Sequence, residues 1–175
     1  PETTGCSLAL LSFVAYQVKK TVEVFDLDVD FDFKWIGYQD EKGNEKNTGC
    51  QPLKQAAEFL RAQKKSDKSV FLFDCDVKGD MYKYNNVITI RIPEYDNPSN
   101  IRKGIENALI LDDIDVEKFR LYHEETDGYG GVKRIPELKK MELCNSICSM
   151  EKEQAKHVLA NLKGVIESVS RSLKE

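Results

Sequence analysis

The sequence predicts an α/β fold with a mostly parallel central sheet covered by helices. The run at 70–73 is wholly apolar, which is typical of a strand that is covered on both faces. The run at 87–92 predicts another strand, with apolar residues at Val87, Ile88, Ile90 and Ile92. Amphipathic segments stand between the predicted strands, as expected of the helical crossovers that join parallel strands. The chain has 175 residues and is 41% hydrophobic, which is enough to bury a core.

The N-terminal part is expected to contain a strand, a helix and a second strand. A short strand is predicted at 8–11. The helix, over 12–25, is predicted by apolar residues at helical spacing: Val14, Val18, Val22 and Phe25. Acidic and apolar residues then alternate, which favours a strand with one solvent-exposed face over 31–36.

The middle of the chain continues the alternation of helices and strands. Pro52 is expected to open an amphipathic helix, since proline suits the first helical turn. The strand at 70–73 follows, and a loop leads to the strand at 87–92, which Pro93 ends.

The C-terminal part is expected to be helical. Asn100 is a predicted cap for a short helix through 108, and Asp115 begins another. Further helices are predicted over 135–150 and at the C-terminus. The last helix carries one continuous apolar stripe: Ala155, Val158, Leu159, Leu162, Val165, Ile166, Val169 and Leu173.

These elements suggest an α/β core over 1–112 and a helical C-terminal extension over 113–175 that packs on the same domain. The apolar stripe of the last helix must be covered. Packing within the domain is the first expectation, and contact with a partner, such as a second copy of the chain, is the alternative.

The charge balance excludes a generally basic nucleic-acid-binding chain. There are 30 acidic and 26 basic residues, with a net charge of −4. Contact with phosphates therefore requires a local basic patch or a bridging divalent cation. The longest apolar stretch, at 7–16, is too short to span a bilayer, so no membrane partner is expected.

The cysteines and histidines argue against zinc and for a reducing compartment. None of the five cysteines forms a CxxC pair, and only two histidines are present. An odd number of cysteines without evident pairing fits the cytosol, so a cytoplasmic location is expected. A calcium loop is also not expected at the alternating aspartates, because Phe31 stands where such a loop needs glycine.

The stretch FLFDCDVKGD contains the first candidate site. Asp74 and Asp76 follow a predicted buried strand directly, and ligand sites in open α/β sheets form at the carboxyl ends of strands. Two carboxylates there can bind a hard cation such as Mg²⁺. The alternative interpretation is an ordinary polar loop that caps nearby backbone amides.

The segment NIRKGIEN is the second candidate. Arg102 and Lys103 could steady phosphate groups, and Gly104 lets the backbone approach another group closely. Glu106 is a candidate third acid beside the metal, or a helix residue that faces water.

The order FKWIG, TGCQPLKQAAEFLRA, VFLFDCDVKGD, VITIRIP and KGIENALI resembles the Toprim domain of OLD-type ATP-dependent endonucleases and related bacterial proteins. The similarity runs from about Tyr16 to the end of the chain. It implies a Rossmann-like fold and Mg²⁺-dependent (or Mn²⁺-dependent) cleavage of DNA phosphodiesters. Asp74 and Asp76 match the family's metal-binding DxD, and KGIEN matches a second motif at Gly104, Glu106 and Asn107.

One motif of the resemblance is missing. The family's first strand should end in a Glu-Gly motif, but no acid is present over 9–14. One hypothesis is a nuclease domain, a fragment or partner of an OLD-type ATPase, with Asp74, Asp76 and Glu106 as catalytic acids. The other is a degenerate Toprim fold that serves as a binding or assembly module, with its last helix in partner contact.

Overall fold

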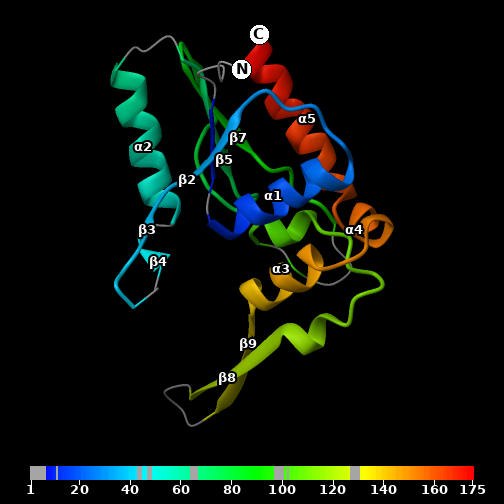
Figure 1. Cartoon of the computed structure of the whole chain (residues 1–175). Helices are drawn as coiled ribbons and strands as arrows, with labels where there is room; N and C mark the ends of the chain where they lie inside the picture. The colour runs from blue at the N-terminus through cyan, green and yellow to red at the C-terminus, as the bar shows by residue number, and fades with distance from the viewer. Residues whose placement is uncertain are drawn as a thin grey trace.

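The computed structural model describes residues 7–10, 12–42, 45–46, 49–63, 67–96, 101, 103–126 and 131–175. Over these residues the chain forms five α-helices, two short 3-10 helices and three sheets (Figure 1). The α/β class predicted from the sequence is confirmed. No helix in the described part of the chain is both long enough and apolar enough to cross a bilayer.

The central sheet has five strands in the order β2-β1-β5-β7-β6. They are β2 (Asp32–Trp35), β1 (Ser7–Leu10), β5 (Ser69–Phe73), β7 (Val87–Arg91) and β6 (Lys83–Tyr84). The first four strands pair in parallel, and β6 pairs with β7 in the antiparallel direction. Every residue of β5 is buried, as the apolar run at 70–73 predicted.

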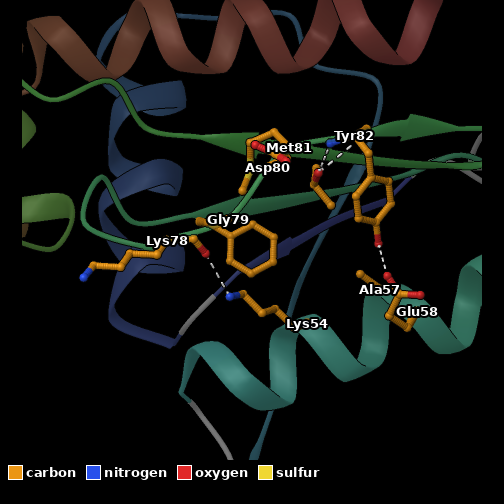
Figure 2. Close-up of a pocket in the computed structure, with 10 residues that line it drawn as sticks. Lys54, Ala57, Glu58, Lys78, Gly79, Asp80, Met81 and Tyr82 are labelled. Carbon is orange, nitrogen blue, oxygen red and sulfur yellow. Dashed lines mark hydrogen bonds between the residues drawn. The ribbon is translucent and has the colours of Figure 1, made fainter.

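Helices cover both faces of this sheet. The strands lie between α2 (Cys50–Gln63) on one side and α5 (Ala160–Lys174) on the other (Figure 2). Helix α1 (Ser12–Val24) contacts α5 and therefore belongs to the same face. Helix α1 begins at Ser12, as predicted. Helix α2 begins at Cys50, two residues before the predicted start at Pro52. The core is thus a sheet with a helical layer on each face.

The C-terminal helices pack against α1. They are α3 (Lys140–Cys148), α4 (Lys152–Val158) and α5, and each of them contacts α1. The apolar stripe at the C-terminus is buried inside the chain, as first expected. It is not carried by one continuous helix, because the chain breaks helical geometry at Leu159, between α4 and α5. The break lets the two segments follow different directions on the core.

Two small antiparallel sheets lie outside the central one. The first pairs β3 (Tyr38–Gln39) with β4 (Glu45–Lys46), and the second pairs β8 (Arg120–Thr126) with β9 (Val132–Leu138). The β8–β9 hairpin projects from the body of the molecule (Figure 1).

The helix predicted over 135–150 is wrong in its first part. Residues 135–138 are extended in β9, where each pairs with a residue of β8, and helix α3 begins only at Lys140. Cross-strand pairing is a long-range effect that helical periodicity does not report. The extension over 113–175 is therefore not purely helical.

Two 3-10 helices join the central sheet to the hairpin. They are η1 (Ile105–Ala108) and η2 (Val116–Phe119), and Asp115 precedes the second as predicted. The predicted cap at Asn100 lies outside the described residues.

Candidate functional site

The order of the strands identifies one end of the sheet as a place for a ligand. From β1 the chain passes through α1 to β2 on one side, and then returns through α2 to β5 on the other side of β1. In open α/β sheets, ligands bind outside the carboxyl ends of the strands where the winding direction reverses. Asp74 follows β5 directly at this end.

Asp74 and Asp76 both contact the turn that opens η1. The backbone N–H of Gly104 donates to Oδ1 of Asp76 at 3.2 Å, and the N–H of Ile105 donates to the Asp74 carboxylate. These contacts correspond to the alternative interpretation, in which the loop caps nearby amides. They do not account for the whole site, because Oδ1 of Asp74 is buried without a hydrogen-bond partner.

The environment of Asp74 disfavours its ionised form. Burial is the largest cause and the negative charge of Glu106 the second, and together with Asp76 they raise the pKa of Asp74 to about 6. The ammonium of Lys140 opposes this rise. Around neutral pH, Asp74 is therefore a largely ionised carboxylate in a position that a cation would stabilise.

The side chain of Glu106 is buried at the site and does not face water. Its side chain is 0% exposed, and its Oε2 accepts a hydrogen bond from Nζ of Lys140 at 3.1 Å. The interpretation of Glu106 as a helix residue that faces water is therefore wrong. A buried carboxylate needs a cation or several hydrogen-bond donors, and Lys140 supplies the cation here.

Gly104 makes this arrangement sterically feasible. Its φ of +73° lies in the region that favours glycine, and an added Cβ would collide with the Glu106 carboxylate and lie 2.8 Å from Nζ of Lys140. The prediction that this glycine permits a close approach is confirmed. The carbonyl of Gly104 also accepts a hydrogen bond from Sγ of Cys75, at 3.4 Å.

Cys75 lies between the two aspartates but is poorly suited to be a nucleophile. Burial, followed by the charges of Asp76 and Asp74, raises the pKa of its thiol to about 11. The thiol therefore remains protonated near neutral pH, and the thiolate is the reactive form. Its hydrogen bond to Gly104 gives it a structural role.

Asn107, the last residue of KGIEN, also has a structural role. Its side chain is buried, accepts a hydrogen bond from the N–H of Tyr95 at 2.7 Å and donates to the carbonyls of Tyr95 and Ile101. These three bonds tie the segment after β7 to η1. They hold the turn at Gly104 against the carboxylates of the β5 loop.

Lys140 is the residue of the site that sequence reasoning missed. Helical periodicity places it in the interior of the helix predicted over 135–150, but it is the first residue of α3 and its ammonium reaches Glu106. No local pattern marks it. The only sequence signal would have been the general requirement of a buried glutamate for a cationic partner.

The end of β1 brings no carboxylate to the site. Strand β1 lies beside β5, with Ala9 opposite Phe71, and the chain leaves it through residues that carry no acid over 9–14. The acids that surround Asp74 are Asp76 and Glu106. Of the other predicted residues, Lys103 lines a neighbouring pocket, and Arg102 lies outside the described residues.

The fit of this site to a metal ion is limited to two carboxylates. Within the described residues, no group of three or more His, Cys, Asp or Glu side chains is arranged to hold a metal ion. Asp74 and Asp76 are oxygen donors, and Asp74 Oδ1 is buried without a hydrogen bond. Mg²⁺ commonly binds through one or two carboxylates and keeps several waters, so such a pair fits it.

A separate cavity of about 280 Å³ lies between α2 and the loop that follows Asp76 (Figure 2). Phe73 and Met81 contribute to its apolar lining. Two of its polar groups already have partners, because Nζ of Lys54 donates to the carbonyl of Lys78 and the Tyr82 hydroxyl donates to Glu58. This cavity is therefore a weaker candidate than the acidic site.

Comparison with known proteins adds no relative to this picture. No protein-family model, no curated protein and no solved structure matches the chain.

Proposed function

We propose that this chain is a Toprim-like, Rossmann-like domain that cleaves DNA phosphodiester bonds with Mg²⁺ or Mn²⁺, as a fragment or partner of an OLD-type ATPase. The proposal is supported by the parallel pairing of β2, β1, β5 and β7, and by acids at the point where the winding reverses. It also draws on the resemblance of the DxD and KGIEN segments to that family.

The observation that carries the proposal is the state of Asp74. Its carboxylate is largely buried, its Oδ1 accepts no hydrogen bond, and the charges of Glu106 and Asp76 help to raise its pKa to about 6. A purely structural capping aspartate would gain more from hydrogen bonds to the ionised form and would have a lowered pKa. A pKa raised by burial and by neighbouring charges is typical of functional sites.

Each residue then has a distinct role. Asp74 and Asp76 would hold the divalent ion, which when bound activates water and neutralises phosphate charge. Glu106 contributes negative charge beside Asp74, and its ion pair with Lys140 holds the Glu106 carboxylate in place. Gly104 and Asn107 hold the turn that presents amides to both aspartates.

A second candidate is a degenerate Toprim fold that acts as a binding or assembly module. Two observations favour it. The end of β1 lacks the family's first acid, and the Lys140 ammonium stands against Glu106, where it would repel an incoming metal ion.

A metal titration tests the first proposal directly. We expect millimolar Mg²⁺ or Mn²⁺ to raise the thermal midpoint of the wild type, because an ion that binds only the folded state stabilises it. The effect should disappear in Asp76→Asn. Metal-dependent cleavage of supercoiled plasmid DNA should disappear in the same variant.

Asp80→Asn is the matched control. Asp80 is an exposed acid of the same loop and lines the separate cavity beside α2, so its replacement removes equal charge without touching the acidic site. A wild type that is neither stabilised nor made active by either metal would contradict the nuclease proposal. Stabilisation without cleavage would favour the second candidate.

A further inference from the structure

A pocket of about 490 Å³ lies beside the acidic site, between the core and the base of the β8–β9 hairpin. The core contributes Ile101 and Lys103, and the hairpin and the start of α3 contribute the other lining residues: Arg120, Pro136, Glu137, Leu138 and Lys140. Its volume lies within the range of about 300–1,000 Å³ that is usual for small-ligand pockets.

The lining of the pocket carries more basic than acidic residues, in a chain that is acidic as a whole. Lys103, Arg120 and Lys140 are basic and Glu137 is acidic. Two of these bases also pair with acids outside the lining, Arg120 with Glu117 at 3.2 Å and Lys140 with Glu106 at 3.1 Å. The whole chain has a net charge of −4, so this concentration of bases is a local feature. A patch of this sign attracts phosphate groups.

The hairpin register places an apolar wall and an aromatic ring beside these bases. Arg120 pairs with Leu138 and Tyr122 pairs with Pro136. Directly opposed residues of an antiparallel pair share a face, and alternate residues of one strand share it too. The pocket-lining face of the hairpin therefore continues outward to Tyr122, which is 47% exposed. Its hydroxyl donates to Glu117 at 2.6 Å, and the guanidinium of Arg134 lies 5.6 Å from the centre of its ring.

Lys140 connects this pocket to the acidic site. It lines the pocket, and its Nζ donates to Glu106 at 3.1 Å. A phosphate held by Lys103 and Arg120 would therefore share a pocket with the lysine that pairs with Glu106.

We propose that this pocket binds a single strand of nucleic acid, with its phosphates on Lys103 and Arg120 and its bases along Pro136 toward Tyr122. The inference rests on the proposed nuclease function and adds the form of the substrate. Basic side chains beside an apolar and aromatic platform are typical of proteins that bind single-stranded nucleic acid. A duplex, which exposes mainly its backbone, would not enter a pocket of this volume.

The test is binding of a fluorescein-labelled oligothymidylate to the full chain, measured by anisotropy in EDTA over a series of salt concentrations. We expect the double variant Lys103→Gln/Arg120→Gln to bind about ten-fold or more weakly. The slope of log affinity against log salt should become shallower by about 0.7 for each phosphate that the variant no longer neutralises. Tyr122→Ala should weaken binding without changing that slope, because stacking releases no counterions.

Lys156→Gln is the control, since it removes one positive charge from an ion pair with Glu153 on α4, at a residue that does not line the pocket. It should bind as the wild type does. Equal binding by the double variant and the wild type at every salt concentration would overturn the inference, as would equal affinity for a duplex of the same length. Because EDTA removes metal, these results leave the metal titration of Asp76→Asn to decide the nuclease proposal by itself.

Discussion

Strand β5 and the β8–β9 hairpin are both regular β-structure, but they are stabilised in opposite ways. All five residues of β5 are buried between helices on both faces, whereas most side chains of the hairpin are exposed. The hairpin depends on its backbone ladder and on contacts at its base, such as the hydrogen bond from the N–H of Lys139 to the carbonyl of Phe119. The buried strand positions the acids that follow it, and the exposed strands leave most of their side chains in contact with solvent.

The largest expected effect of a substitution lies in β5. Phe71 is 0% exposed, so Phe71→Ala should lower the free energy of unfolding by about 3–5 kcal/mol through reduced burial and the cavity that remains. Urea denaturation followed by circular dichroism measures this change. A change below about 1 kcal/mol would mean that the core around β5 is less tightly packed than the structure shows.

A smaller effect, of opposite sign, is expected just beyond β5. Folding raises the pKa of Asp74 from 3.8 to about 6, so the folded state disfavours its ionised form. The resulting loss of unfolding free energy is absent below about pH 4, grows as the pH rises between about 4 and 6, and is complete above about pH 6. Asp74→Asn should therefore stabilise the protein by about 2–3 kcal/mol at pH 8.

The pH profile of that variant separates this cause from others. The gain in unfolding free energy should shrink as the pH falls below 6 and vanish near pH 4, measured by urea denaturation at each pH. A gain that is constant with pH, or a reduced stability at pH 8, would show that the buried charge of Asp74 is not the source of the effect.

The sequence predicted the β5 region well because burial leaves a local mark. An apolar run followed by two acids identifies both the strand and the end of the sheet at which Asp74 lies. The proximity of Glu106 followed from no spacing rule, because the turn at Gly104 brings it back from the segment after β7. Glu106 was a candidate because of its place in the segment NIRKGIEN and the match of KGIEN to the family's second motif, and no periodicity pointed to it.

The hairpin region was predicted poorly for the complementary reason. Its strands have no buried face to produce a strict alternation, and the apolar residues at 135–150 mimic helical spacing. Pairing with residues 120–126 decides the structure of β9, and this partner is distant in sequence from α3. Lys140 was missed as a consequence, because its role depends on where β9 ends.

The smallest expected effect is at the exposed hairpin. Val132 is 63% exposed, so Val132→Ala should change the free energy of unfolding by less than about 0.5 kcal/mol. The same substitution in β5, Val70→Ala, removes a side chain that is 0% exposed and should cost about 2 kcal/mol. Equal changes for the two variants, by urea denaturation, would contradict the contrast between the strands.

The join between the hairpin and helix α3 has a mechanical consequence. Strand β9 ends at Leu138, and only Lys139 separates it from the residue whose ammonium meets Glu106. The position of the Lys140 ammonium is therefore tied to the base of the hairpin. A displacement of the hairpin would change the distance between this ammonium and the Glu106 carboxylate, and with it the electrostatic field at Asp74.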